Sequence, residues 1–239
     1  MHMADALLTP AVAGVMYAAS AVVAGASIVE LHKEEKQDLT SVGKKLPTMA
    51  VMSALVFAGQ MINYTIPGTG SSGHLCGGLL LTSVLGPWAG FLSMIVILTI
   101  QSLFFADGGL MALGANVWNM AFYGCFVGYF LIYRPLMRSR CFARRGERAA
   151  NRLKITLASV LGCVLTLQLG AFSVVLETTL SGITDLPFGA FCAIMQPIHL
   201  AIGLIEGLIT AAVLLFLYEA RPELLRDVCT GGETAGKVS

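Results

Sequence analysis

The stretch LCGGLLLTSVLG, residues 75–86, decides how often the chain crosses a membrane. The stretch that follows, PWAGFLSMIVILTIQSLFFA (87–106), is long enough to span the hydrocarbon core, because a helix needs about 20 residues to do so. Residues 75–86 are too few by that measure. The topology of the chain therefore depends on whether this short stretch completes a crossing.

Composition indicates a membrane protein. Of the 239 residues, 56% are hydrophobic and 12% are charged, whereas soluble domains carry roughly 25% charged residues. The mean hydropathy is +0.78. A net charge of +1 argues against nucleic acid as a partner. Besides the two stretches above, the apolar runs are 10–31, 46–66, 110–133, 155–180 and 188–218.

The positions of the basic residues predict the number of crossings. All 15 Lys and Arg lie in three segments, which the positive-inside rule places in the cytoplasm. They follow the first, fifth and last runs: Lys33, Lys36, Lys44 and Lys45; Arg134, Arg138, Arg140, Arg144, Arg145, Arg148, Arg152 and Lys154; Arg221, Arg226 and Lys237. An even number of crossings must separate the first two segments, so residues 75–86 complete one.

We therefore predict an all-α polytopic membrane protein, a bundle of seven transmembrane helices. Its N-terminus is expected outside and its C-terminus in the cytoplasm. Residues 1–220 would form a single transmembrane domain, and residues 221–239 a short cytoplasmic tail.

Two histidines fall on the predicted outer side. His2 is next to the terminus, and His74 follows NYTIPGTGSSG (63–73), whose glycines and serines fit a close-packed re-entrant turn. The short third helix places His74 below the outer surface, within reach of the N-terminal segment. The outer loops carry no Lys or Arg, and this side attracts a cation through its carboxylates. These are Asp5, Asp107, Glu177 and Asp185.

A Met-His start has a specific metal chemistry. The terminal amine of Met1 and the backbone nitrogen of His2 can close a five-membered chelate ring, and that nitrogen and Nδ1 of His2 an adjacent six-membered ring. His74 can supply a fourth nitrogen. Planar nitrogen coordination favours Ni(II) or Cu(II), and binding would release protons. Either histidine alone is more often a solvated or packing residue, so spacing by itself leaves the metal role open.

Four motifs carry a family resemblance: MHMADALLTP (1–10), GTGSSGHLCGG (68–78), QSLFFADGGLMALGANVWNM (101–120) and HLAIGLIEGLIT (199–210). In this order they resemble the CbiM/NikM family, the substrate-binding components of energy-coupling-factor (ECF) transporters for cobalt and nickel. The resemblance covers nearly the whole chain and implies a seven-helix bundle with its N-terminus outside. It also implies that Met1, His2 and His74 bind the metal.

The resemblance further implies a mechanism and partners. Such a component captures the ion outside a prokaryotic (inner) cell membrane for ATP-driven, ABC-type uptake. It works with a transmembrane coupling (T) subunit and cytoplasmic ATPase (A) subunits. This chain has no GxxxxGK[ST] motif, and it is expected to be no enzyme and to need no cofactor. Because the sequence stops at Ser239, any small accessory membrane subunit is expected to be a separate chain.

Nickel is favoured as the substrate and cobalt comes next. Planar nitrogen donors and the affinity order both favour Ni(II). The family, however, uses the same Met-His start for both metals, so the chelate alone does not choose between them.

Several other polar residues are candidates for orienting the ligands through hydrogen bonds. They are Asp5, Ser72, Gln101, Asn116 and Asn119. Asp5 could instead cap the first helix, and the two asparagines, three apart on one helix face, could equally join helices. For Asp107, which precedes two glycines, we favour a turn.

His199 and Glu206 lie seven apart on one face of the last predicted helix, about 10.5 Å along its axis. That is too far to share one ion, so a structural pair or a coupling role is expected, with metal binding by His199 a minority alternative. Cys76, two residues beyond His74, points elsewhere on a helix and is expected to pack in the core.

Two alternatives from other classes stay open. One is a capture component for an organic vitamin, which would need a larger pocket and would not depend on Met1 and His2. The other, less favoured because no HExxH motif is present, is an intramembrane metalloenzyme that uses His74 and His199.

Overall fold

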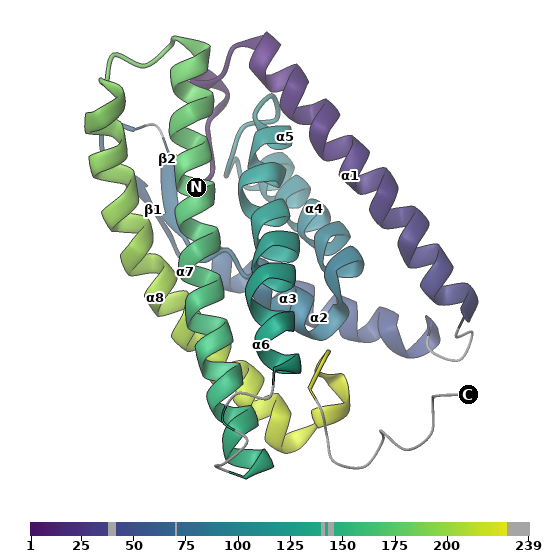
Figure 1. Cartoon of the computed structure of the whole chain (residues 1–239). Coiled ribbons are helices and arrows are strands. Elements are labelled where there is room, and N and C mark those ends of the chain that lie inside the picture. The colour runs from purple at the N-terminus through teal and green to yellow at the C-terminus, as the bar shows by residue number, and fades with distance from the viewer. Residues whose placement is uncertain (38–41, 70, 140–141, 143–145, 229–239) are drawn as a thin grey trace.

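The computed structural model describes residues 1–37, 42–69, 71–139, 142 and 146–228. Within them the chain is mostly helical and carries a small two-stranded sheet (Figure 1). The elements are η1 (Asp5–Leu7), α1 (Pro10–Gln37), α2 (Val42–Gln60), β1 (Asn63–Ile66), β2 (Ser71–His74), α3 (Gly78–Leu85), α4 (Pro87–Phe104), α5 (Leu113–Asn116), the π-helix η2 (Val117–Tyr133), α6 (Arg134–Arg138), α7 (Glu147–Ser181), α8 (Phe188–Ala220) and η4 (Pro222–Leu224). Several predicted cytoplasmic residues lie outside this part of the chain: Arg140, Arg144, Arg145 and 229–239.

Five helices in the described residues are long and apolar enough to cross a membrane. They are Pro10–Glu34, Pro87–Phe104, Leu113–Arg138, Glu147–Ser181 and Phe188–Ala220. They correspond to five of the seven predicted runs, and they make the chain a multi-pass membrane protein. The second run forms a shorter apolar helix, Leu46–Gln60, and the third forms the eight-residue α3. A total of seven crossings stays a prediction.

The helices α7 and α8 run side by side, and η2 packs along α7, whereas α1 diverges obliquely from them (Figure 1). The short helix α3 is buried throughout. It touches η2 at two glycines, since a Cβ on Gly78 would lie 3.0 Å from Cα of Gly124. At the other end of α3, Gly86 has a φ of 89° and is followed by Pro87, which opens α4.

The prediction of an all-α chain is wrong between residues 63 and 74. The predicted re-entrant turn is a β-hairpin, in which β1 and β2 pair antiparallel with Asn63 opposite His74 and Ile66 opposite Ser71. The Oγ1 atom of Thr69 donates a hydrogen bond to the Ile66 carbonyl at 2.9 Å and accepts one from the Ser71 amide at 3.2 Å. These side-chain bonds replace part of the ladder at the turn, as is common for threonine.

The N-terminal segment adds itself to the open edge of this hairpin. Met3 forms an antiparallel bridge with Ser71, and the Ser72 amide donates to the His2 carbonyl at 3.2 Å. The Met1 amine donates to the Ser72 carbonyl. The terminus therefore lies beside β2 and α7 (Figure 1). An edge strand otherwise exposes unpaired backbone groups, and here the terminus covers them.

Candidate metal centre

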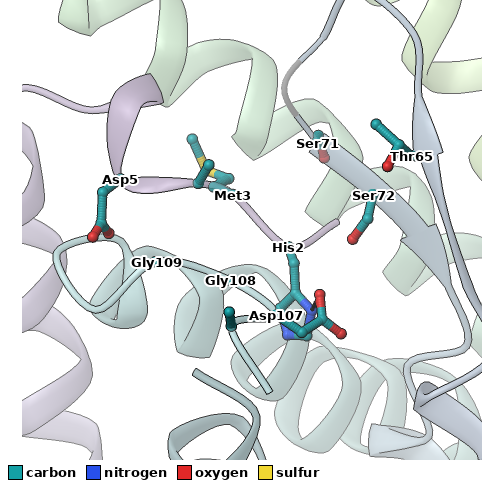
Figure 2. Close-up of a pocket in the computed structure, with 11 residues that line it drawn as sticks. His2, Met3, Asp5, Thr65, Ser71, Ser72, Asp107, Gly108 and Gly109 are labelled. Carbon is teal, nitrogen blue, oxygen red and sulfur yellow. Dashed lines mark ion pairs between the residues drawn. The ribbon is translucent and has the colours of Figure 1, made fainter. Parts of the chain in front are cut away.

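The side chains of the first three residues are all buried, but on alternating faces of an extended segment. Successive side chains of a strand point to opposite faces, so Met1 and Met3 share one face and His2 takes the other. Met1 and Met3 are buried in two different apolar clusters, with 1% and 0% of their surface exposed. The imidazole of His2 is 3% exposed and faces the Asp107 loop (Figure 2). The Met-His-Met sequence thus fixes the side of the strand on which the imidazole lies.

The main chain of Met3 is held on both sides. Its amide donates to Oδ1 of Asn116 at 2.8 Å, and its carbonyl accepts from Nδ2 of Asn116 at 3.2 Å. The Gly109 amide donates to the same carbonyl at 2.9 Å. Asn116, which the sequence singled out, therefore lies beside the N-terminal strand and binds its backbone rather than a histidine.

The structure brings His2 and His74 together. Their ring centroids lie 4.4 Å apart, with the ring planes at 37°. Nδ1 of His74 lies 2.6 Å from the Leu75 carbonyl, so this nitrogen carries the proton and Nε2 keeps its lone pair. Within the described residues, Nε2 of His74 and Nε2 of His2 are buried and have no hydrogen-bond partner. Buried nitrogens without a partner are costly unless they bind something.

Asp107 is the residue that the sequence interpretation undervalued. It does lie in a turn, between Ala106 at φ 52° and Gly108 at φ 82°. Its carboxylate, however, lies 3.0 Å from Nδ1 of His2 (Figure 2). It also accepts a 2.7 Å hydrogen bond from Asn63. A pair of glycines was a sufficient reason to expect a turn, but no local pattern links residue 107 to residue 2.

A cavity of about 270 Å³ opens onto this pair of side chains. It is lined by His2, Asp107, the serines of β2, Thr65 and the Gly108–Gly109 loop (Figure 2). Oγ of Ser71 and Oγ of Ser72 are buried and unpartnered in the described part of the chain. Polar groups of His2, Asp107 and the two serines therefore line this cavity.

Burial makes the nitrogen groups neutral. It lowers the pKa of the Met1 amine from its ordinary 8.0 to about 5. Burial also lowers the pKa of His2, although Asp107 opposes the change, and lowers the pKa of His74 well below its usual range. Burial alone would raise the pKa of Asp107, but the contacts with His2 and Asn63 lower it. Neutral amine and imidazole nitrogens are the forms that bind metal ions.

The other predicted orienting residues have different partners. Asp5 lies in η1 and accepts a hydrogen bond from the Ala112 amide at 3.0 Å, so it caps the start of α5 and not the first helix. Ser72 acts through its main chain. Asn119 donates to Glu177 at 2.8 Å and lies 3.7 Å from Sδ of Met3. Gln101 donates to Gln60 at 2.8 Å.

The segment that follows His74 is anchored by buried side chains. The carboxylate of Glu206 accepts hydrogen bonds from the Cys76 amide at 2.6 Å and the Gly77 amide at 2.9 Å. Gln60 donates to the Cys76 carbonyl. Glu206 thus binds the free amides just before α3, where the positive end of the helix dipole lies. The Cys76 thiol contacts the Met120 carbonyl at 3.1 Å, in agreement with its predicted core role.

His199 and Glu206 do not form the pair that the sequence suggested. Nδ1 of His199 lies 2.8 Å from the Met195 carbonyl on its own helix, and its Nε2 is buried without a partner among the described residues. Both residues lie on the face of α8 that carries Ile202, which packs near Gly73 of β2. The pairing failed because Glu206 meets two backbone amides of another segment instead.

Within the described residues, no three His, Cys, Asp or Glu side chains are grouped closely enough to hold a metal ion. Buried nitrogens instead gather at the terminus: the Met1 amine, the His2 imidazole and the His74 imidazole. A metal site at this end would therefore have to include main-chain nitrogen.

The fold and the terminus together define a multi-pass helical membrane protein with buried nitrogen groups beside a polar cavity. Residues 2–224 match the family model described as CbiM, cobalt uptake substrate-specific transmembrane region. The chain belongs to this family.

Similar proteins and a solved structure support this family assignment. The chain is 39% identical, over 98% of its length and 71% of the relative, to a protein of Archaeoglobus fulgidus named as a fused nickel transport protein NikMN. It is 33% identical, over 75% of its length and 76% of the relative, to the cobalt transport protein CbiM of Sorangium cellulosum. A crystal structure of a transition metal transporter superposes with a TM-score of 0.77 at 31% identity, covering 92% of this chain and 93% of that one.

The chain is therefore a membrane component of cobalt or nickel transport and not an enzyme. This excludes the intramembrane metalloenzyme alternative. The metal ion is the substrate that the protein carries, not a cofactor.

Proposed function

We propose that this chain is the substrate-capturing (S) component of an ECF-type uptake transporter, with Ni(II) as its preferred substrate and Co(II) second. Seven crossings, with the N-terminus outside, would place the His2 cavity on the uptake side of a prokaryotic cell membrane. A transmembrane coupling subunit and cytoplasmic ATPase subunits would drive transport. An accessory membrane subunit would be a further partner.

The ligands proposed are the Met1 amine, the backbone nitrogen and Nδ1 of His2, and Nε2 of His74. The observation that carries this assignment is the close approach of the His2 and His74 rings, whose centroids lie 4.4 Å apart, next to a terminal amine that is buried with them. Nδ1 of His2 lies 3.0 Å from the Asp107 carboxylate, so in the metal-free protein this nitrogen carries a proton that must leave when the ring closes on the metal. Asp107 therefore competes with the metal for this nitrogen.

Nickel is proposed over cobalt on the donor set. Four nitrogens in a plane suit Ni(II), and the affinity order also places Ni(II) above Co(II). The relative named for nickel transport is 39% identical to this chain, and the relative named for cobalt transport is 33% identical. This difference in identity also favours nickel. Competition between the two ions for the purified chain measures this preference directly.

The decisive experiment replaces His2 by alanine. The variant keeps the Met1 amine and the main chain but loses Nδ1 of the proposed chelate, so nickel affinity should fall by about 100-fold or more. The matched control is His32→Ala, a histidine on α1 far along the chain from the terminus. Calorimetry and metal analysis of the full chain give the readout. Equal nickel affinity in the two variants would refute the proposed site.

A further inference from the structure

The side chain of Met1 occupies a slot between two helices. It is 1% exposed and belongs to the main apolar cluster of the bundle. A Cβ on Gly170 of α7 would lie 2.6 Å from Sδ of Met1, 3.3 Å from its Cε and 2.4 Å from the Asn119 carbonyl oxygen. The slot therefore exists because residue 170 has no side chain, which lets the sulfur lie against the backbone of α7.

The two methionines fix the strand on either side of His2. Met3 is fully buried, but in a second cluster that includes Leu8, Ile66 and Phe191. Met1 lies in the first cluster, with Cys76 and Leu79. Two apolar side chains in separate clusters hold an extended segment at two points, so both the position and the direction of the backbone between them are set.

We propose that the Met1 side chain is a positioning element of the metal site, separate from the nitrogen that the same residue donates. This inference rests on the proposed function. A free Met-His terminus in water is flexible, and ordering it costs conformational entropy. Burial of the methionine side chain offsets that cost before the ion arrives. The amine is then preorganised next to His2 and His74, and this raises affinity without adding a ligand atom.

The proposal predicts that the side chain of residue 1 affects nickel affinity in the folded protein but not in a free peptide. The side chain of residue 1 contributes no atom to the chelate rings. In short peptides with the sequences MHMAD and AHMAD, nickel affinity should therefore be nearly the same. In the folded chain the same exchange should matter, because only there does the side chain have a slot to occupy.

The test produces the full chain with a leader that a protease removes without leaving residues of its own. This yields the wild type and the variants Met1→Leu and Met1→Ala with free amines. Met1→Ala should bind Ni(II) about tenfold to 100-fold more weakly. Met1→Leu, similar in volume, should stay within about threefold of the wild type. The absorption band of planar Ni(II) should persist in all three at saturating metal, because the ligand atoms are the same.

A second pair of variants covers the case in which the first set fails to assemble. Gly170→Ala fills the slot and should weaken nickel binding. Gly162→Ala is the matched control on the same helix, since its Cβ would meet the Leu79 side chain at 2.5 Å and not Met1. If both glycine variants lose affinity equally, or if Met1→Ala binds as tightly as the wild type, the positioning proposal is wrong. A wild-type chain that binds no nickel would instead refute the proposed function.

Discussion

The imidazole of His74 lies 4.4 Å from that of His2, centroid to centroid, yet the two residues enter the site differently. His2 belongs to the N-terminal strand, whereas His74 ends β2. Among the residues that the structure describes, the His74 side chain makes one hydrogen bond, from Nδ1 to the neighbouring Leu75 carbonyl, so its removal should disturb the fold little. Its loss should therefore report on the metal rather than on stability.

We predict that His74→Ala weakens Ni(II) binding by about 100-fold, because one of four nitrogen donors is lost. The unfolding temperature of the metal-free chain should change little. His32→Ala is a suitable control, since His32 lies near the C-terminal end of α1, far along the chain from Met1. Calorimetric titration measures both variants. Wild-type affinity in His74→Ala would exclude His74 as a ligand.

Replacement of Glu206 by glutamine should loosen the segment that carries His74. The carboxylate accepts hydrogen bonds from two buried amides, and a glutamine can accept from only one of them. The orphaned amide should cost about 1–3 kcal/mol of stability, and nickel affinity should fall as well. Glu219→Gln is the control, because Glu219 makes surface ion pairs with Arg148 and Arg152. Thermal unfolding of Glu206→Gln at the wild-type temperature would contradict this role.

Asn116→Ala should release the N-terminal strand from the bundle. The side chain makes two hydrogen bonds to the Met3 backbone, and both partners are buried. The Met3 amide would be left without a partner, which should cost about 1–3 kcal/mol, whereas the Met3 carbonyl keeps its hydrogen bond from the Gly109 amide. Hydrogen exchange at the Ser72 amide, which donates to the His2 carbonyl, should become faster in the variant. Unchanged protection there would show that Asn116 does not hold the strand.

Docking of the metal-free terminus should strengthen as the pH rises. The pKa of the Met1 amine falls from 8.0 to about 5 on burial, so the undocked terminus binds more protons between these values. Docking is therefore least favourable at acid pH. Its free energy becomes more favourable between about pH 5 and pH 8 and does not change above pH 8. Exchange at the Ser72 amide, corrected for the intrinsic pH dependence, follows this equilibrium. The Leu81 amide inside α3 is the internal control, and equal pH profiles for the two amides would contradict the prediction.

The proposed topology can be tested in intact cells. In a background without native cysteines, Asp185→Cys in the α7–α8 loop should react with a maleimide that cannot cross the membrane. Arg148→Cys at the start of α7 should react only after the cells are opened. Both positions are exposed in the structure. The reverse pattern would invert the predicted orientation and place the His2 cavity in the cytoplasm.

Hydropathy was sufficient to predict five of the helices, because a long apolar run has few other ways to satisfy its backbone in a bilayer. It failed at residues 63–74, where Gly, Ser and Thr dominate and the periodic signal is weak. There the hairpin is bordered by the N-terminal segment, which bridges to Ser71 through Met3, a contact between distant parts of the chain that no local pattern encodes. The alternation of Met1, His2 and Met3 was the available signal for that strand, but three residues are too few to establish a period.

Among the site residues, too, some could be predicted from the sequence, whereas others depend on contacts between distant parts of the chain. His2 and His74 were predicted together because topology and terminal chemistry both led to them. The contacts of Asp107 with His2 and of Glu206 with the Cys76–Gly77 amides join residues far apart in the chain. Helix spacing suggested a partner for Glu206 on its own helix, and tertiary packing supplied a different one.

The burial of the Met1 amine has a practical consequence for anyone who purifies this protein. An affinity tag joined to the front of the chain would turn that amine into a peptide nitrogen and force additional residues into a space that is already filled. The tagged protein would still fold its long helices and behave well on a column, yet its metal content would mislead. Tags belong at the other end of the chain, and the mass of the first peptide should be confirmed before any titration is interpreted.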